Sequence, residues 1–434
     1  MPRLSTVLAF SLLTSACGGG PNISDVEYSV SENIATVVNV SWSLDESADA
    51  YIEYGHDEQF DLKTSISTGE SHSVSLLGLK PEADAQFRVV VSTDDGDVAG
   101  EAYDVTTGPL TNAFPTLAGE GEGDAGGWML APMIGTSTGP VIMNPDGNIV
   151  WAWIDESGLD VYRARISQDG KSVIYNAASV SGDPADDAKL VRVALDGSSV
   201  EEIPVELLAH DFVEHEDGTI GAMVVEYDET GEIRGDALVE IAPDGTQNVV
   251  WSAFDCFDPE TQDPGEDSGW TFGNALDYSV EHDAYYLGMR NFSGIIKIPR
   301  ADFSCEWVFG GEANTFEFSA GSATFLHQHQ FHVMDDSIVV FDNDGYGGMA
   351  SRVVEYDVDF EAQTAEESWS YTDVTLYTFV LGDVTRLDDG DTLVTWSVSG
   401  QIDRISPNGD VDWTLNTGVG AVFGFNTVVD SLYQ

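Results

Sequence analysis

The sequence predicts an all-β protein, in which an N-terminal β-sandwich is followed by a six-bladed β-propeller. Two observations lead to this prediction. Residues 23–107 contain short runs in which apolar and polar residues alternate, separated by turn residues. Beyond residue 115, Asp-Gly and Asn-Gly turns followed by short strands recur about every 50 residues, a spacing typical of propeller blades.

The chain has 434 residues, which favours more than one domain, and its 42% hydrophobic content can fill real cores. Its 76 acidic residues outnumber 16 Lys and Arg, so the formal net charge is −60. Such a charge repels nucleic acids and anionic lipids, and we expect no nucleic-acid partner. The acidic excess indicates a hydrated surface suited to salty water, because salt screens the self-repulsion.

The N-terminus, MPRLSTVLAFSLLTSACGGG, has a short basic region at Arg3 and a mostly apolar run that is too short to span a bilayer. Small residues then precede Cys17. The segment resembles a bacterial lipoprotein signal, which implies lipidation of Cys17 and anchoring to the outer membrane, facing the periplasm or the cell surface. We therefore predict a signal peptide at 1–17 and a tether at 18–22. Ordinary signal cleavage stays open, and either route implies export.

The remaining cysteines, Cys256 and Cys305, would lie in an oxidising compartment, where disulfides persist. We predict that they pair. The alternative is two buried free thiols.

The runs ATVVNVSWSL, AYIEYG, HSVSLLGL and AQFRVVVST indicate the strands of the sandwich at 23–107. This segment resembles a fibronectin type III domain, with Trp42 as the early-strand tryptophan, Tyr51–Gly55 as a central strand and Leu79–Pro81 before the penultimate strand. Ala85 stands where such domains have a corner tyrosine. Modules of this kind space or dock other domains, so we assign no chemistry to it. Residues 108–115 are predicted to be a linker.

In the predicted propeller at 116–434, NPDGNIVWAW (144–153), APDGTQNVVW (242–251) and SPNGDVDWTL (406–415) share one pattern. Related turns give a series near positions 146, 196, 244, 302, 357 and 408, and a second series near 169, 217, 282, 335 and 389 interleaves with it. Two hairpin turns per unit mean four strands per unit, and the count gives six blades. Trp151, Trp251, Trp307 and Trp413 recur at repeat positions and are predicted to be core residues.

Polar residues in a propeller site come from different blades, so candidates lie far apart in the chain. Four stretches break the blade pattern. The first contains the pair His210-Asp211, the second contains Asn274, the third contains Arg290, and the fourth is the histidine-rich FLHQHQFHV at 325–333. Arg290 lies in an otherwise apolar stretch that we expect to be a strand.

His327 and His329 form an H-x-H pair, which in a strand places both rings on one face. That spacing also suits a metal, but no third ligand is evident, so we expect none. A structural role, with the rings bonded to backbone carbonyls, is the alternative for both histidines and the favoured one for His327.

The order of these motifs resembles the bacterial aryl sulfotransferase family over most of residues 115–415. His210 matches the histidine of its "HD" motif, Arg290 the arginine of "SxR", although Gly288 replaces the serine, and His329 the histidine of "QH". The "W..GG" and "FDN" motifs match 307–311 and 341–343. The resemblance implies a periplasmic six-bladed propeller with an N-terminal sandwich. It further implies that His329 is the nucleophile, forming a sulfohistidine, while His210 and Arg290 bind sulfate oxygens.

One family position differs. The "HxNS" histidine falls on Phe272, two residues before Asn274, and the loss of such a group commonly lowers a rate by orders of magnitude. A neighbouring histidine, His327 or His332, is a candidate replacement. We therefore take Asn274, Phe272 and His327 as substrate-binding candidates.

The chemistry agrees with this assignment. Neutral imidazole is a good nitrogen nucleophile near pH 7, and an arginine fork stabilises charge on equatorial oxygens. Because no Gly-rich phosphate loop is present, we expect no nucleotide donor and no cofactor. The leading hypothesis is an exported enzyme that moves sulfate between phenolic sulfates and phenols. A non-catalytic binding or scaffold lipoprotein, favoured by Phe272, and an enzyme for another anionic ester are the alternatives.

Overall fold

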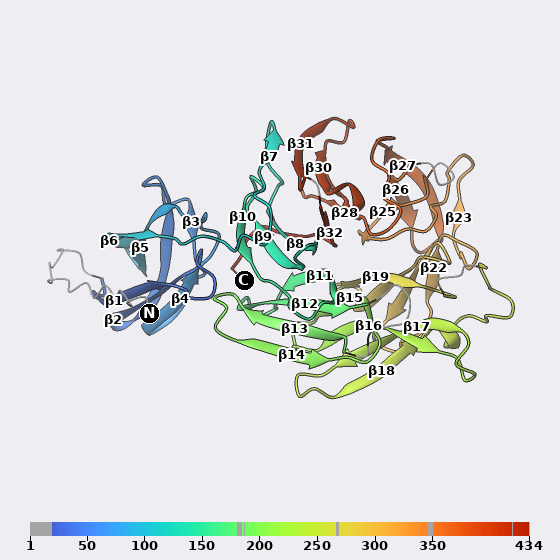
Figure 1. The fold of residues 1–434 in the computed structure, drawn as a ribbon, viewed down its shortest axis with the longest axis horizontal. Coiled ribbons are helices and arrows are strands. Elements are labelled where there is room, and N and C mark those ends of the chain that lie inside the picture. Colours follow the sequence, from blue (N-terminus) through green and yellow to red (C-terminus); the bar gives the residue numbers. More distant parts are fainter. Residues whose placement is uncertain are drawn as a thin grey trace.

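The structure, a computed structural model, describes residues 20–179, 185, 187–265, 269–345, 350–418 and 420–433. It confirms the predicted all-β class with a propeller-like arrangement (Figure 1). Two short 3-10 turns lie within these ranges, η1 (Ala253–Asp255) and η2 (Ser397–Ser399). No helix in the described part of the chain is long and apolar enough to cross a membrane. The predicted signal peptide and Cys17 lie outside the described residues.

The N-terminal strands form one hydrogen-bonded sheet. They are β1 (Ile23–Val30), β2 (Val38–His56), β3 (Leu62–Lys63), β4 (Ser67–Leu76), β5 (Asp84–Thr93) and β6 (Gly96–Thr106). Strand β2 has 19 residues, and its first part pairs with β1 while its second part pairs with β5. Two halves of the sheet therefore share β2 and enclose one apolar cluster, which includes Trp42, Ile52 and Phe87.

The N-terminal sheet is docked against the following part of the molecule (Figure 1). Ser31 Oγ donates to the carbonyl oxygen of Asp196 at 2.6 Å, and Thr36 Oγ1 donates to that of Val150 at 2.5 Å. Near the C-terminus, the hydroxyl groups of Tyr54 and Tyr433 lie 2.9 Å apart. These polar contacts fix the sheet to two neighbouring sheets and to the C-terminal segment.

Six further sheets follow in the described residues, and the first three are as follows. The first contains β8 (Trp128–Gly135), β9 (Gly139–Met143), β10 (Ile149–Ala152), β32 (Ala421–Phe423) and β33 (Thr427–Val429). The second contains β11 (Asp160–Ile166), β12 (Ser172–Ala178), β13 (Lys189–Ala194) and β14 (Val200–Pro204). The third contains β15 (Leu208–Glu214), β16 (Ile220–Tyr227), β17 (Arg234–Ile241) and β18 (Gln247–Ser252).

The other three sheets complete the arrangement. The fourth contains β19 (Gly273–Ser279), β20 (Ala284–Met289), β21 (Gly294–Pro299) and β22 (Trp307–Phe309). The fifth contains β23 (Glu317–Phe318), β24 (Phe331–Val333), β25 (Ser337–Asp342), β26 (Arg352–Asp359) and β27 (Thr364–Tyr371). The sixth contains β28 (Asp383–Arg386), β29 (Thr392–Trp396), β30 (Gln401–Ile405), β31 (Val411–Asn416) and β7 (Gly119–Gly121).

The first and last strands of the six sheets pair with strands from the other end of the sequence. Strand β7, the earliest, pairs with β31 in the sixth sheet, while β32 and β33 from the C-terminus pair with β8 in the first. Neighbouring sheets meet through their first strands, such as β11 with β15 and β15 with β19. The first strands therefore gather polar residues from several sheets in one place.

The predicted turns fall where a four-stranded repeat requires them. The first series of predicted turns, near positions 146, 196, 244, 302, 357 and 408, falls between the third and fourth strands of each sheet, counted from the strand that contacts the neighbouring sheets. The exception is Asp357, which lies within β26, just before the turn that leads to β27. The second series lies between the first and second strands of the sheets that carry it. The four recurring tryptophans are at most 3% exposed, which confirms them as core residues.

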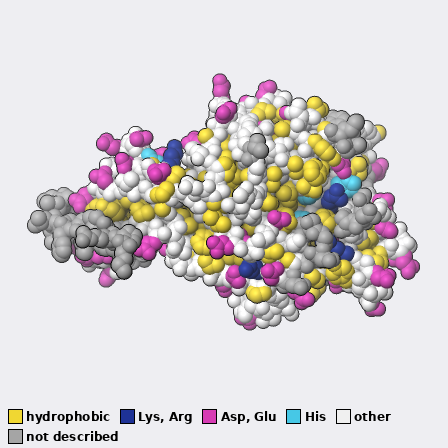
Figure 2. Space-filling view, viewed as in Figure 1, with side chains coloured by type: hydrophobic (Ala, Val, Ile, Leu, Met, Phe, Trp, Pro, Cys, Tyr) yellow, Lys and Arg dark blue, Asp and Glu magenta, His cyan; other side chains and the backbone are white. Residues whose placement is uncertain are grey.

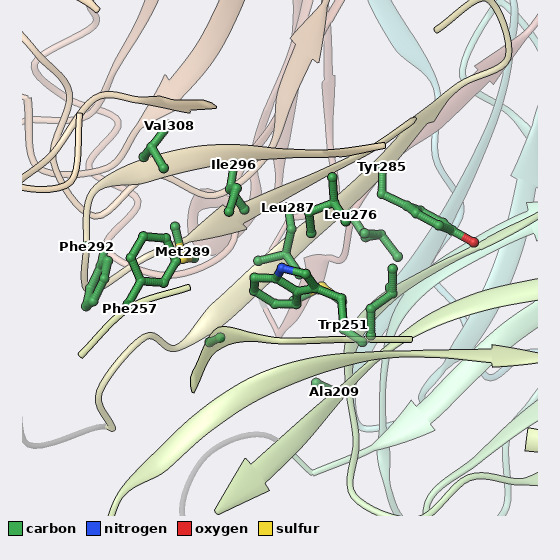
Figure 3. Packing of buried hydrophobic residues seen from close by; sticks show 14 of the residues in the cluster. Ala209, Trp251, Phe257, Leu276, Tyr285, Leu287, Met289, Phe292, Ile296 and Val308 are labelled. Atoms are coloured by element: carbon green, nitrogen blue, oxygen red, sulfur yellow. The ribbon is translucent and has the colours of Figure 1, made fainter. Parts of the chain in front are cut away.

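A hydrophobic cluster between the third and fourth sheets contains the chain neighbours of two predicted site residues, His210 and Arg290. Figure 3 shows Trp251 facing Leu276 and Leu287, with Ala209 on the strand below. Ala209 is the chain neighbour of His210, and Met289, in the same cluster, is the neighbour of Arg290. Close packing of these apolar neighbours restricts the backbone that presents both site residues.

The predicted disulfide between Cys256 and Cys305 is present. Cys256 directly follows η1 at the end of the third sheet, and Cys305 lies in the turn between β21 and β22 of the fourth. The bond therefore links two neighbouring sheets at their outer strands.

Candidate active site

Three predicted site residues from three sheets converge. His210 lies within β15, Arg290 directly follows β20, and His329 lies two residues before β24. The Phe272 ring centroid is 5.4 Å from that of His210 and 5.9 Å from the Arg290 guanidinium carbon. His210 and Arg290 both lower the pKa of His329, so the three side chains share one electrostatic environment. Arg290 lies in the turn after the apolar strand, not within it as predicted.

The imidazole of His329 is fixed by the amide of Asn343. His329 Nδ1 lies 2.8 Å from Asn343 Oδ1. Asn343 Nδ2 donates to the carbonyl oxygens of Thr378 and Leu381, each at 2.8 Å, so its Oδ1 must face the ring. Nδ1 of His329 is therefore the donor in this contact, and the lone pair of the neutral ring is on Nε2.

Burial keeps the His329 ring neutral. The residue is 2% exposed. Desolvation is the main reason why its pKa falls to about 3, with His210 and Arg290 acting in the same direction and the Asn343 hydrogen bond opposing them. A ring with that pKa is unprotonated at neutral pH and offers a nucleophilic nitrogen.

His210 has the same kind of tautomer. Its Nδ1 lies 3.0 Å from the carbonyl oxygen of Gly273, which can only accept, so Nδ1 donates and Nε2 carries the lone pair. Burial lowers the pKa of His210 to about 4, and the charges of Arg234 and Arg290 contribute. A neutral His210 can take a proton at Nε2 but has none to donate from that atom.

Phe272, which stands at the position of a family histidine, lies beside both His210 and Arg290. Its φ is +50°, a left-handed conformation that is strained for a bulky residue. Asp236 stabilises this turn, because its Oδ2 accepts hydrogen bonds from Thr271 Oγ1 at 2.5 Å and Gly273 N at 2.6 Å. The Arg290 N–H donates to the Phe272 carbonyl at 3.0 Å, which ties the two residues together.

Asn274 and Gln328 support the backbone beside His329. Asn274 is 0% exposed, and its Nδ2 donates to the carbonyl oxygen of Gln328 at 2.7 Å. Gln328 Nε2 donates in turn to the carbonyl oxygen of Gly294 at 3.0 Å. Asn274 thus holds the segment that carries His329, and its predicted contact with substrate stays a prediction.

The strand predicted around His327 and His329 is wrong. Strand β24 begins only at Phe331, and His327 has a φ of +52°, so the two rings are not related by strand geometry. His327 Nδ1 instead bonds to Asp344 Oδ2. Asp344 Oδ1 accepts a hydrogen bond from Tyr377 at 3.0 Å. His332, the other candidate replacement, accepts from the Arg386 N–H at 3.4 Å. Among the described residues, no group of three or more His, Cys, Asp or Glu side chains is arranged to hold a metal.

Comparison with known proteins places this geometry in a family. The sequence pattern of the arylsulfotransferase (ASST) family matches residues 134–414, well over half of the chain. The chain belongs to the arylsulfotransferase family. The matched region includes His210, Phe272, Arg290 and His329.

No curated protein matches the chain with significance. Among solved structures, a protein of unknown function from Bacteroides caccae is 13% identical, covering 76% of this chain and 95% of that one, with a TM-score of 0.39. A catalytically inactive virginiamycin B lyase from Staphylococcus aureus is also 13% identical, covering 71% and 87%, with a TM-score of 0.41. Likenesses at this level do not bear on the activity of this arylsulfotransferase family member.

A buried ion cluster lies beneath the site of this arylsulfotransferase family member, and the sequence analysis missed it. Arg163 on β11 donates from Nε to Asp211 Oδ1 at 3.1 Å and from Nη1 to Asp383 Oδ2 at 3.3 Å. All three residues are less than 5% exposed. They come from the second, third and sixth sheets, so the cluster joins innermost strands that are far apart in the sequence.

The two carboxylates of this cluster are not equivalent. Burial opposes ionisation of both, but Arg163 and Arg165 together lower the pKa of Asp211. For Asp383, burial is the larger effect and raises the pKa to about 6. Asp211 is therefore the permanent counter-ion of Arg163. An arginine in the alternating strand VYRARI was the available sequence signal, since a buried guanidinium requires a carboxylate partner.

Arg234 is the second residue that the sequence analysis missed. It opens β17, is half-buried, and its guanidinium carbon lies 5.4 Å from the centroid of the Phe272 ring. Nothing in its sequence context distinguishes it, since it follows a surface turn. In the space-filling view of Figure 2, basic side chains (dark blue) and histidines (cyan) lie close together on the right-hand side of the molecule. Acidic side chains (magenta) are spread around its outline.

An aromatic loop follows β27 beside the site. Tyr377 is 37% exposed and Phe379 is 52% exposed, and their ring centroids are 6.2 Å apart. The same loop supplies the Thr378 and Leu381 carbonyls that orient Asn343. Its exposed rings therefore belong to the segment that positions the partner of His329.

Proposed function

We propose that this chain is an exported arylsulfotransferase that moves a sulfuryl group from a phenolic sulfate ester to a phenol through a sulfohistidine at His329, without a nucleotide donor. Membership of the arylsulfotransferase family supports the reaction class. The tautomer of His329 supports the nucleophile, because its Nδ1 hydrogen bond to Asn343 leaves the lone pair on Nε2. That hydrogen bond is the single observation on which the proposal depends.

In the first half-reaction, Nε2 of His329 forms a bond to sulfur as the bond from sulfur to the phenolic oxygen breaks. The bond electrons leave with the phenolate. Positive charge develops on the imidazole, and the Asn343 Oδ1 acceptor stabilises it through Nδ1–H. The Arg290 guanidinium stabilises the negative charge on the sulfuryl oxygens.

In the second half-reaction, the Nε2 lone pair of His210 takes the proton of the acceptor phenol. The phenol oxygen then bonds to sulfur as the nitrogen–sulfur bond breaks and its electrons return to His329. Because burial lowers the pKa of His210 to about 4, its imidazolium then gives up this proton, which the phenolate released in the first half-reaction takes up, and the neutral ring is restored.

The aryl part of either substrate fits the aromatic surroundings. Phe272 is half-buried beside both His210 and Arg290, and Tyr377 and Phe379 are exposed on the adjoining loop. Aromatic rings bind other aromatic rings through offset or edge contacts and apolar burial. We assign the phenolic rings to this side of the site.

Export and anchoring belong to the same proposal. The N-terminal segment up to Cys17 supports a lipid-anchored protein at the outer membrane, and the Cys256–Cys305 disulfide supports an oxidising compartment.

The test is turnover of p-nitrophenyl sulfate with phenol as the acceptor. We expect nitrophenol release that depends on phenol and is lost in His329→Ala, and a mass increase of one sulfuryl group on a His329 peptide when the acceptor is omitted. The matched control is His282→Ala, an exposed histidine in the turn between β19 and β20. Release that persists in His329→Ala contradicts the nucleophile.

Phe272 favours a second candidate, a binding protein that has lost catalysis. An apolar ring occupies the place of a family imidazole, and such a loss lowers rates by orders of magnitude. Under this alternative, the wild-type protein binds phenolic sulfates in calorimetry but releases no nitrophenol and gives no sulfated histidine.

A further inference from the structure

The loop between β27 and β28 carries a large share of the exposed apolar side chains. Its residues 374–382, VTLYTFVLG, include no charged residue, although 76 of the 434 residues of the chain are acidic. Twelve large hydrophobic side chains are exposed in the described part of the chain, and four of them belong to this loop, namely Val374, Tyr377, Phe379 and Val380. The other eight are spread singly along the sequence. Such a concentration on a strongly acidic protein indicates a binding surface.

The polar groups of the loop are tied to the candidate active site. The carbonyl oxygens of Thr378 and Leu381 accept from Asn343 Nδ2, each at 2.8 Å, and the same amide orients the nucleophilic imidazole. The Tyr377 hydroxyl donates to Asp344 Oδ1 at 3.0 Å. Because these polar groups bind within the fold, the exposed part of the loop is apolar.

A further exposed side chain, that of Leu326, belongs to the segment that the loop contacts. The Asp344 N–H donates to the Leu326 carbonyl at 3.2 Å, so Leu326 and Tyr377 both contact Asp344. On the loop itself, the ring centroids of Tyr377 and Phe379 are 6.2 Å apart. We refer to Leu326, Tyr377, Phe379 and Val380 as the apolar surface.

The apolar surface lies within electrostatic reach of Arg290. Burial and the contact with Asp344 raise the pKa of Tyr377, and the charge of Arg290 opposes them. An aryl group joined to a sulfuryl group at Arg290 therefore starts close to the surface. A single phenyl ring covers only part of four apolar side chains, whereas two rings bury more of them. A charged group on the second ring would meet no opposite charge in the loop.

We propose that the apolar surface binds the distal part of an extended, uncharged aryl group, so that sulfate esters with two fused or linked rings are better donors than single-ring esters. The preference between donors rests on the proposed function. The binding part of the inference does not, because it can be measured with compounds that do not react.

The first experiment measures binding of 2-naphthalenesulfonate and methanesulfonate by isothermal titration calorimetry. In both compounds sulfur is bonded to carbon, so no sulfuryl transfer accompanies binding. We expect Phe379→Ala to weaken binding of 2-naphthalenesulfonate about 10-fold, through loss of an aromatic contact and its burial, and to leave methanesulfonate binding unchanged. Wild-type affinity for 2-naphthalenesulfonate in this variant overturns the proposal.

Two further sets of variants serve as controls. Val380→Ala and Val249→Ala each shorten an exposed valine, and Val249 lies on the outer strand β18 of the third sheet. We expect only Val380→Ala to weaken binding, about two- to threefold, and equal effects of the two contradict the proposal. Phe379→Tyr keeps the ring and should bind as the wild type does. A loss in Phe379→Tyr as large as that in Phe379→Ala shows that the ring does not bind the ligand, which also contradicts it.

The second experiment separates this inference from the proposed function. Transfer from phenyl sulfate and from 2-naphthyl sulfate to 4-methylphenol is compared. We expect kcat/KM to be about 10-fold higher for the naphthyl ester in wild type and the two values to become similar in Phe379→Ala. Equal values for the two esters in wild type overturn the donor preference and leave the enzyme proposal standing. No transfer from either ester, with affinity for 2-naphthalenesulfonate still lost in Phe379→Ala, overturns the enzyme proposal and leaves the aryl-binding surface standing.

A third experiment tests other occupants of the apolar surface, a second copy of the chain or a lipid bilayer. Analytical ultracentrifugation and cosedimentation with phosphatidylethanolamine–phosphatidylglycerol vesicles are measured for wild type and Phe379→Ala. We expect the two proteins to behave alike in both assays. If Phe379→Ala loses self-association or vesicle binding and keeps wild-type affinity for 2-naphthalenesulfonate, the surface binds that partner and the proposal is overturned.

Discussion

Gln330 donates a hydrogen bond of 2.9 Å from Nε2 to Asp211 Oδ2, and each of the two is the chain neighbour of a site histidine. Gln330 follows His329, and Asp211 follows His210. Asp211 is also held by Arg163 and by the Leu276 N–H at 3.1 Å. The relative position of the two imidazoles is therefore set by a buried polar contact one residue away from each.

Loss of that contact should lower turnover more than stability. In Gln330→Met, which keeps the side-chain length, the segment carrying His329 loses its direct tie to β15. We expect kcat to fall about tenfold, as for one hydrogen bond to a charged group, with little change in KM because Arg290 is untouched. Gln401→Met is the control, because Gln401 donates a similar bond to Asp403 in the sixth sheet at 2.8 Å. Equal effects of both variants contradict a positioning role for Gln330.

Removing the partner of His329 should impair the nucleophile. In Asn343→Ala, Nδ1–H of the ring loses its acceptor, and the positive charge that develops on the imidazole is no longer stabilised. We expect kcat/KM to fall about 10–100-fold, with some loss of stability because the hydrogen bonds from Asn343 Nδ2 to the Thr378 and Leu381 carbonyls are lost. Steady-state kinetics and thermal unfolding measure the two effects. Asn148→Ala, in the turn before β10, serves as the control, and unaltered kinetics in Asn343→Ala refute the assignment.

The activity should persist in mild acid. Burial lowers the pKa of His329 to about 3 and that of His210 to about 4, both below the ordinary value near 6.5. The rings are neutral above these values, so kcat should be nearly constant from about pH 8 to 5 and decline near pH 4. Between about pH 6.5 and 4 the unfolded chain binds more protons than the folded one, so these two groups make the free energy of unfolding decrease as pH falls. A pH–rate profile whose acid limb lies near 6.5 contradicts desolvation of the rings.

Reduction of the disulfide should destabilise the contact between the third and fourth sheets. Cys256 and Cys305 are 49 residues apart in sequence, and closing a loop of this size contributes about 2–4 kcal/mol. We expect Cys256→Ser with Cys305→Ser to lower the urea midpoint, and wild-type protein to lose the same amount in reductant. An unchanged midpoint in the double variant refutes a stabilising role.

Cys17 should determine attachment to the membrane. If the lipoprotein-type signal is used, the mature N-terminus is a lipidated cysteine, and the mass of the N-terminal peptide increases accordingly. We expect Cys17→Ser to move the protein from the membrane fraction of the producing bacterium to the soluble periplasmic fraction. Retention of the variant in the membrane fraction, or an unmodified Cys17 in wild type, rules out the anchor.

Local patterns were enough to predict the all-β class and the propeller-like arrangement. Alternating runs gave the strands, turn residues gave the hairpins in each sheet, and the recurring tryptophans gave core positions such as Trp151 and Trp413, which are both 2% exposed. These features are readable because side-chain alternation and turn chemistry act between residues close in sequence. The motifs around His210, Arg290 and His329 likewise marked stretches that depart from the repeat.

The tertiary structure decided what those residues can do. Which nitrogen of His329 carries the lone pair depends on Asn343, and the neutrality of both rings depends on burial, which no local pattern reveals. The strand predicted around His327 was wrong because tertiary contacts of Gln328 and Asp344 shape that segment instead. Arg234 and Arg163 went unnoticed for the same reason: the partners of a guanidinium come from other sheets, and only the folded chain brings them together.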